Sequence, residues 1–170
     1  MIKRILLTCL LLCALPALAD NKFAINLHAG FTQPIENDYS PESPTFGLSI
    51  GAKTPHWLFR AGYTDFDKFN NNKYDEGLKI RSTSINAKLD YKIFTKFFDF
   101  YVGGGIHRTN THTDFYGYRL QEETGVSPSL DIILSKNLVR FFALQLESQY
   151  IFDVSGSDLA TIVVNAQFTF

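Results

Sequence analysis

The chain has 170 residues, of which 45% are hydrophobic and 15% aromatic, and its formal net charge at pH 7 is -1. This length is enough for one domain with a sizeable core and is short for two. The near-neutral charge excludes the basic footprint of a nucleic-acid-binding protein. A mean hydropathy of -0.04, without a second long apolar run, excludes a bundle of membrane-spanning helices.

Residues 1–19 have the pattern of a secretory signal peptide. A positively charged start precedes an apolar run over residues 5–15, and a small-x-small cleavage site ends at Ala19. Both cysteines lie in this segment, so the mature barrel domain over residues 20–170 is expected to contain none. The alternative is an uncleaved membrane anchor, for which the apolar run is short.

The segments that follow alternate between apolar and polar side chains, as strands with one apolar face do. In the first of them, the apolar Ile25 and Leu27 flank the polar Asn26, and the pattern continues to Phe31. The alternation predicts eight strands, over residues 23–32, 45–52, 57–64, 84–93, 98–107, 126–135, 142–152 and 161–170.

Connections of two lengths join these strands. The second, fourth and sixth strands are followed by only a few residues. Polar loops are expected after the first, third, fifth and seventh strands, over residues 33–43, 67–77, 109–124 and 153–158. This alternation of lengths is typical of an outer-membrane β-barrel. We therefore expect an all-β fold, an eight-stranded antiparallel up-and-down transmembrane β-barrel, which is closed because lipid offers no partner to an open edge.

A second fold is compatible with the same strands. In a soluble secreted barrel or sandwich, the apolar face would form the core and the polar face would meet water. Aromatic residues at the strand ends favour the membrane barrel, because interfacial girdles lie there. With both termini in the periplasm, the periplasmic girdle comprises Trp57, Phe97, Phe142, Phe168 and Phe170. The outer girdle comprises Phe31, Phe46, Tyr63, Tyr150 and Phe152.

The last ten residues have apolar side chains at every second position, namely Ile162, Val164, Ala166, Phe168 and Phe170. This ending resembles the β-signal that the barrel assembly machinery recognises. With the signal peptide and the eight strands, the whole mature chain resembles the small OmpA/OmpX and opacity-type family of outer-membrane barrels. The resemblance implies a Gram-negative outer membrane, with lipid and lipopolysaccharide around the barrel. Since the sequence stops at Phe170, tethering by a following peptidoglycan-binding domain is not expected.

Six charged side chains are expected to face the barrel interior: Arg60, Lys88, Asp90, Asp99, Asp131 and Glu147. The interior of an eight-stranded barrel is just wide enough to be filled by side chains, which disfavours a general diffusion pore. Unpaired charges are costly in such a confined space, so we expect hydrogen-bonded ion pairs that brace the barrel. A narrow gated ion path through these groups is the alternative.

Catalysis would require a nucleophile beside a base, as in the lipid-modifying enzymes that share this barrel size. The candidate bases, none of which lies in a recognisable motif, are His28, His56, His107 and His112. Neighbouring strands bring His107 toward Ser127 or Asp131, but such residues are ordinary in a polar interior. His107 and His112 lack the further ligands of a closed metal site. We predict no catalytic residue, no metal and no cofactor, with a lipid-modifying enzyme as an alternative.

The outer loops combine acidic and aromatic side chains. The candidate contact residues are Glu36, Asp38, Phe69, Tyr74, Tyr116 and Tyr118. Tyrosine and phenylalanine supply rigid contact area, and charges steer a partner. The sequence therefore predicts a non-enzymatic structural and surface-interaction protein, acting in adhesion or envelope integrity, with an extracellular protein or glycan as partner. Alternatively, the loop acids only bind divalent cations at the lipopolysaccharide surface, and the aromatics only pack the rim.

Overall fold

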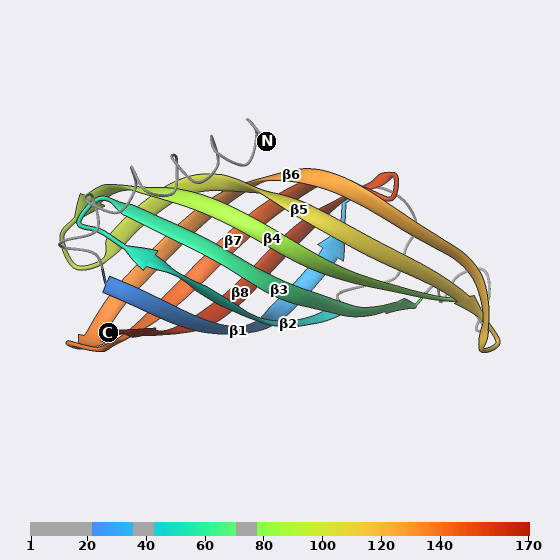
Figure 1. The fold of residues 1–170 in the computed structure, drawn as a ribbon, viewed down its shortest axis with the longest axis horizontal. Coiled ribbons are helices and arrows are strands. Elements are labelled where there is room, and N and C mark those ends of the chain that lie inside the picture. Colours follow the sequence, from blue (N-terminus) through green and yellow to red (C-terminus); the bar gives the residue numbers. More distant parts are fainter. Residues whose placement is uncertain (1–21, 36–42, 71–77) are drawn as a thin grey trace, which may run out of the picture.

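The computed structural model describes residues 22–35, 43–70 and 78–170, which form one closed barrel of eight strands (Figure 1). The strands are β1 (Lys22–Pro34), β2 (Ser43–Lys53), β3 (Trp57–Asn70), β4 (Leu78–Thr95), β5 (Asp99–Phe115), β6 (Tyr118–Val139), β7 (Phe142–Val154) and β8 (Ser157–Thr169). Each strand is antiparallel to the next, and β8 pairs with β1, which confirms the predicted fold class. The predicted signal peptide lies outside the described residues. In the part of the chain that the structure describes, no helix is long and apolar enough to cross a membrane.

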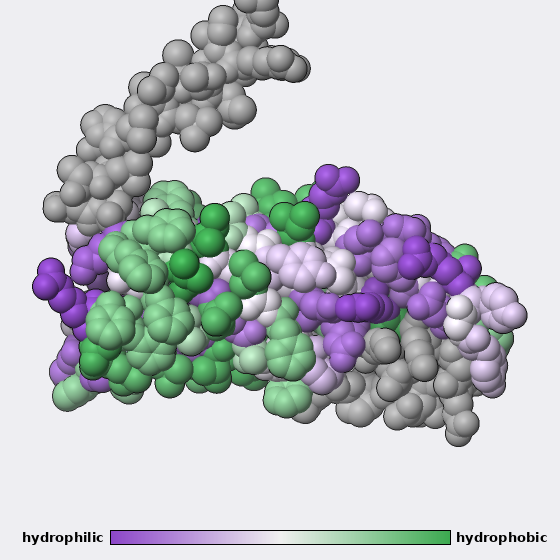
Figure 2. Space-filling view, turned by 60° about the horizontal axis from the view of Figure 1, so that its bottom comes forward, coloured by the Kyte–Doolittle hydropathy of each residue, from purple (hydrophilic) through white to green (hydrophobic). Residues whose placement is uncertain are grey.

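The two faces of the sheet divide the side chains by polarity. Along β1, Asn26 and Thr32 are fully buried inside the barrel, whereas Leu27 and Phe31 are more than half exposed outside. Successive strand residues face opposite sides, so each period-two pattern becomes a polar interior and an apolar exterior. Figure 2 shows apolar side chains over the half of the barrel nearest the short turns and polar ones over the other half. This polarity is the reverse of a soluble barrel with an apolar core, so that alternative is wrong.

The apolar exterior ends at adjacent positions on three neighbouring strands. Its last outward apolar residues there are Ile85 on β4, Ile106 on β5 and Val126 on β6, each 60% or more exposed. The next outward residues along these strands are polar, namely Thr83, Arg108 and Thr124. This boundary marks the level at which the strands leave the lipid.

The β5–β6 hairpin continues far beyond this boundary (Figure 1). β6 has 22 residues, about twice the nine to eleven that a tilted strand needs to cross a bilayer. Residues 109–124, which were expected to form a long loop, are paired strands on both sides of a tight turn, so that prediction is wrong. Between the lipid boundary and the tip, both faces of this extension are polar, and without an apolar face a strand leaves no alternation in the sequence.

Two-residue turns close two of the hairpins at the end that the sequence predicts to be extracellular. We call this end the outer end and the opposite end the periplasmic end. Tyr116 and Gly117, with φ of 47° and 86°, join β5 to β6. Ser155 and Gly156, with φ of 52° and 82°, join β7 to β8. Positive φ at both central residues is characteristic of the type I′ turn, which matches the twist of antiparallel strands and suits glycine. The loop that we expected over residues 153–158 is therefore also a tight turn.

Candidate functional site

Five charged side chains meet in the middle of the barrel interior. Arg60 on β3 donates to Asp90 on β4 (Nη2–Oδ2 2.8 Å) and to Glu147 on β7 (Nη1–Oε2 2.6 Å). Lys88 on β4 donates to the other oxygen of Glu147, Oε1, at 2.8 Å, and its Nζ lies 3.9 Å from Asp131 Oδ1. We call these five residues the central cluster. Two cations thus stand against three carboxylates, and Arg60 bridges opposite walls of the barrel.

The central cluster is closed off from solvent. Its arginine and its three carboxylates are each 5% exposed or less. Asn165 adds a hydrogen bond to Glu147 (3.0 Å), and Gln149 adds one to Asp131 (2.7 Å). The void beside the cluster has a volume of about 10 Å³, roughly the space of one water probe. At this level the interior is filled by paired charges and their amide partners.

Asp99, the sixth predicted interior charge, lies outside the central cluster. It stands near the periplasmic mouth, where its Oδ1 accepts a hydrogen bond from Thr95 (2.7 Å) and lies 3.7 Å from Lys92 Nζ. The register explains the separation, because Asp99 pairs with Thr95 at the very end of β4 whereas Asp90 lies further into the barrel. The six charged residues that we predicted as one interior network therefore form two groups. Five of them make up the central cluster, and Asp99 pairs separately with Lys92 at the mouth.

Two apolar layers lie inside the barrel, one on each side of the central cluster, and neither was predicted. The outer layer consists of Phe66, Ile151, Val154 and Leu159. The periplasmic layer consists of Leu58, Tyr101 and Ile133, all fully buried. A signal was present in the sequence, because Leu58 and Ile133 interrupt the polar faces of their strands. Apolar constrictions resist wetting, so both layers add to the closure of the interior.

A backbone irregularity turns Val154 into the outer apolar layer. Strict alternation after the buried Ile151 would place Asp153 inside the barrel. Asp153 instead has a φ of 50°, and the β7–β8 register shifts between Ile151 and Val154. The buried position thus goes to a valine, and the carboxylate of Asp153 stays at the surface.

A cavity of about 350 Å³ opens above the outer apolar layer. Val154, Leu159 and Ile80 contribute apolar surface to it, and the walls carry hydroxyl and amide groups, among them Thr111 and Gln121. The cavity belongs to the outer mouth, and the apolar layer lies between it and the central cluster.

His107 is fully buried in the interior and has partners at both ring nitrogens. Its Nδ1 lies 3.0 Å from Ser84 Oγ, and its Nε2 lies 3.0 Å from Gln149 Nε2, which in turn donates to Asp131. In the described part of the chain, no hydrogen bond joins His107 to Ser127 or Asp131. Ser127 instead donates to a backbone carbonyl of β7 at 2.9 Å. His107 therefore does not bond directly to Ser127 or Asp131, and Ser84, the serine that lies beside it, is only 1% exposed.

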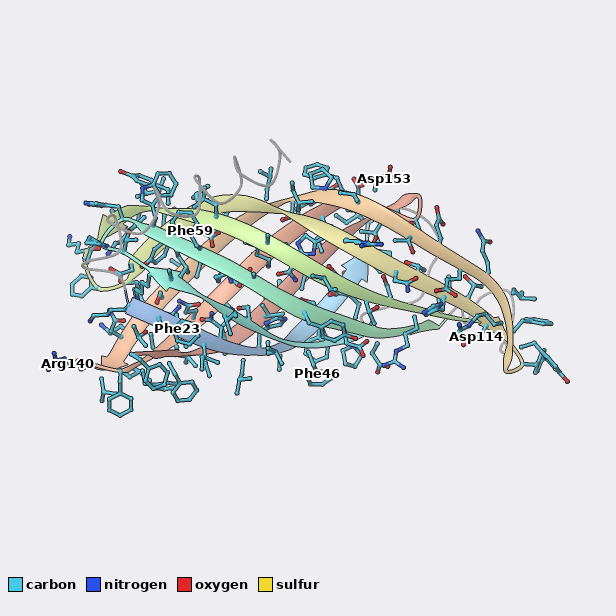
Figure 3. All side chains as sticks on the ribbon, in the orientation of Figure 1. Phe23, Phe46, Phe59, Asp114, Arg140 and Asp153 are labelled. Carbon is cyan, nitrogen blue, oxygen red and sulfur yellow. The ribbon has the colours of Figure 1, made fainter. Side chains whose placement is uncertain are left out.

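The tip of the β5–β6 hairpin presents exposed apolar and aromatic side chains. Tyr116, Tyr118 and Leu120 are 69%, 78% and 63% exposed. The ring of Phe115 packs edge-on against that of Tyr116, with 4.7 Å between the centroids. Figure 3 shows the hairpin end near Asp114, at the far end of the barrel from Arg140. Two of the six predicted contact residues, both tyrosines, therefore lie at the outermost part of the described chain.

Polar contacts on the outward face tie the two strands of this hairpin together. Glu122 on β6 accepts a hydrogen bond from Asn110 across the hairpin on β5 (3.3 Å) and another from Arg119 within β6 (3.4 Å). The Nδ1 atom of His112 lies 3.8 Å from the same carboxylate. These contacts continue the connection between the strands beyond the lipid boundary.

Of the other four predicted contact residues, only Phe69 lies in the part of the chain that the structure describes. Glu36, Asp38 and Tyr74 lie outside the described residues. Phe69 pairs through its backbone with Ile80 on β4. Within residues 22–35, 43–70 and 78–170, no group of three or more histidine, cysteine, aspartate or glutamate side chains could hold a metal ion.

Four of the five residues of the predicted β-signal lie in β8, and Phe170 follows directly after it. Ile162 and Val164 are exposed on the lipid-facing side, and the ring of Phe168 lies 5.2 Å from that of Phe142 on β7. The backbone N–H of Phe170 donates to the carbonyl of Phe23 on β1 at 2.9 Å. The segment thus lies at the seam that closes the barrel.

No protein-family model matches the chain, and no curated protein matches it. Solved structures do match. Neisserial surface protein A has a TM-score of 0.67 at 14% identity, with 89% of this chain and 98% of that chain covered. The N-terminal β-barrel domain of Pseudomonas aeruginosa OprF has a TM-score of 0.60 at 13% identity, with 86% and 97% covered. Ail, the attachment invasion locus protein of Yersinia pestis, has a TM-score of 0.58 at 12% identity, with 88% and 97% covered.

These neighbours are small eight-stranded outer-membrane barrels of Gram-negative bacteria. At identities of 12 to 14%, the similarity to these structures shows a shared fold and no more. The chain therefore has the fold of this group, and the predicted resemblance in architecture is confirmed. The outer-membrane location that the sequence predicts is also the location of these neighbours.

Proposed function

We propose that this protein is a non-enzymatic barrel of the Gram-negative outer membrane that holds the β5–β6 hairpin outside the cell as a contact surface. The observation that carries the proposal is the hairpin itself. Its paired strands extend well past the lipid boundary and end in exposed tyrosines, Tyr116 and Tyr118. A paired hairpin loses little conformational entropy on binding, which favours a contact role.

Lipid, lipopolysaccharide and the barrel assembly machinery are the partners that we propose for the barrel itself. The apolar exterior fits the hydrocarbon core, and the closing strand carries the alternating pattern that resembles the β-signal. At the outer boundary, Arg81 and Arg108 are exposed on the outward face of β4 and β5. Guanidinium groups at this level suit the phosphates of lipopolysaccharide.

A protein or an uncharged glycan is the best-supported extracellular partner. One structural neighbour, Ail, has been solved with the heparin analogue sucrose octasulfate. The outer charges of this chain have a different balance. The described acidic side chains around the outer end are Asp65, Asp67, Asp114, Glu122, Glu123, Asp153 and Asp158, against three described basic ones, Arg81, Arg108 and Arg119. An acidic surface repels sulfated chains, whereas exposed tyrosines suit protein surfaces and sugar rings.

The interior supports a barrel that neither conducts nor catalyses. An ion path would have to pass the central cluster and both apolar layers, and the void between them holds about 10 Å³. A lipid-modifying site would need a serine and a base open to one leaflet, whereas His107 and Ser84 are buried within the barrel. Steady conductance in a planar bilayer would contradict the first expectation, and hydrolysis of a lipid ester by the refolded protein would contradict the second.

The contact role is tested by shortening the hairpin within its own register. His112 and Glu122 are paired across β5 and β6, so residues 113–121 can be replaced by Asn-Gly, which forms a type I′ turn. Bacteria that express the shortened protein should lose adhesion to immobilised matrix proteins and uncharged glycans. The gel-mobility shift of the folded barrel on boiling should be retained.

A point variant separates contact from folding. The double substitution Tyr118→Ala with Leu120→Ala removes exposed side chains at the tip, and we expect adhesion to fall severalfold. Phe97→Ala is the matched control, because Phe97 is 71% exposed but lies in the β4–β5 turn on the periplasmic side. Adhesion that is unchanged by both the shortening and the tip substitutions would overturn the proposed function.

A further inference from the structure

The periplasmic end of the barrel is strongly basic. Its strand ends and turns carry Lys22, Lys53, Lys92, Lys96, Lys136 and Arg140. Outside the central cluster, Asp99 is the one acidic side chain at this end among residues 22–35, 43–70 and 78–170. The outer end has the opposite balance. Such a separation of charge along one barrel indicates that an anion is favoured at the periplasmic mouth.

Four of these cations surround one cavity. It has a volume of about 470 Å³, and its charged lining consists of Lys22, Lys53, Lys92, Arg140 and Asp99. The cations come from β1, β2, β4 and the β6–β7 turn, so closure of the barrel brings them together. We call this cavity the basic vestibule.

The positive charge of the basic vestibule is only partly compensated. Asp99 lies 3.7 Å from Lys92 Nζ. Lys53 donates to neutral amide oxygens, at 3.5 Å to Asn137 and 3.2 Å to Gln167. Asp99 attracts the charge of Lys53, and the like charges of Lys92 and Lys22 repel it.

In the described part of the chain, no carboxylate comes within 4.0 Å of the side-chain nitrogens of Lys22, Lys53 or Arg140. Four cations thus share the cavity with one carboxylate, so the repulsion among the cations is only partly offset, and a bound anion would reduce it.

We propose that the basic vestibule binds a phosphate-bearing anion that enters from the periplasm. Arg140 supplies a planar fork that matches two phosphate oxygens, and Lys53 and Lys22 supply point charges around it. Lys53 is half-buried at the mouth, where the weaker screening strengthens its attraction for an anion. Two sources share this chemistry: the headgroup of an anionic phospholipid of the inner leaflet and a free phosphorylated molecule of the periplasm.

Pyrophosphate is the probe for the first test. The full mature protein is refolded in a non-ionic detergent and titrated with pyrophosphate in a calorimeter. The double variant K53Q/R140Q removes two charges from the basic vestibule. The control K96Q/K136Q removes two charges from the same end but outside the cavity, where Lys96 and Lys136 lie over the rings of Phe97 and Phe98.

We expect saturable binding that weakens roughly tenfold or more in the vestibule variant and changes less than about twofold in the control. Absence of saturable binding to the wild-type protein would overturn the proposal. An equal loss in both variants would also overturn it, because it would show diffuse attraction to the whole basic end.

Bilayers then distinguish the two sources of phosphate. The titration is repeated in nanodiscs of phosphatidylcholine, with and without phosphatidylglycerol. Competition by phosphatidylglycerol in the wild-type protein assigns the site to a lipid headgroup, and equal pyrophosphate binding in both nanodiscs assigns it to a soluble phosphate. The hairpin-shortened protein should bind pyrophosphate as the wild type does, so failure of this site leaves the proposed contact role unaffected.

Discussion

The two sides of the barrel differ in height. β1, β2, β7 and β8 have 11 to 13 residues, close to the span of a bilayer, whereas β4, β5 and β6 have 17 to 22. Lipid requires strict alternation of the short strands, since their outward side chains must be apolar. The extension of the tall strands is in water, where paired backbone and a few polar contacts suffice. Stability is therefore expected to reside in the lipid-embedded barrel, and contact with partners in the extension.

The largest effect is expected from the centre of the embedded barrel. Arg60→Met leaves Asp90 and Glu147 without their bridging cation in a buried site, which should cost about 3–5 kcal/mol of unfolding free energy. Urea unfolding in lipid vesicles, followed by the fluorescence of Trp57, measures this cost. Lys92→Met is the control, because Lys92 lines the open periplasmic mouth. Equal costs for the two variants would remove the distinction between centre and mouth.

The outer apolar layer should give the next largest effect. Ile151→Ala opens a cavity between packed side chains and should cost about 2–4 kcal/mol in the same urea assay. Ile162→Ala removes the same atoms from a lipid-facing position of β8 that is 59% exposed, and its cost should be clearly smaller. If the lipid-facing substitution were the more costly one, the layer would not stabilise the barrel.

A change in the extension should act locally. Gly117→Val forces a β-branched residue into a φ of 86° at the hairpin turn, at a cost of about 1–3 kcal/mol. Amide hydrogen exchange should accelerate around the turn, with an unchanged urea midpoint for the whole barrel. Gly125→Ala is the control, because an added Cβ there would meet only ordinary contact, 3.5 Å from Thr109 Oγ1. A lowered urea midpoint for Gly117→Val would show that the extension and the barrel unfold as one unit.

The smallest effect is expected at the surface ion pair on the tall side. Arg81 Nη2 lies 2.6 Å from Asp65 Oδ2, and the arginine side chain is half exposed. Arg81→Ala should therefore change the unfolding free energy by about 0.5 kcal/mol or less, and high salt should abolish even that difference. A cost above about 1 kcal/mol that persists in salt would place this pair among the structural contacts of the barrel.

The sequence predicts the fold wherever lipid imposes a pattern. All eight strands follow from period-two alternation, and Arg60 and Glu147 could be assigned to the interior from the same pattern. Side-chain partners could not be predicted, because ion pairs such as Arg60 with Glu147 join strands that are far apart in sequence and set by barrel shear. The hairpin was missed because its two faces are both polar. The outer apolar layer was not predicted because its residues lie on three different strands, and the pattern within one strand does not show which side chains of other strands it meets.

The length of β6 has a consequence for the cell surface. Eight residues of β6, 118–125, lie beyond the boundary at Val126, and at about 3.4 Å per residue with a tilt near 40° they rise by roughly 20 Å. The tyrosines at the turn are thus held well above the level at which the strands leave the lipid, so a large partner can contact them without approaching the lipid surface.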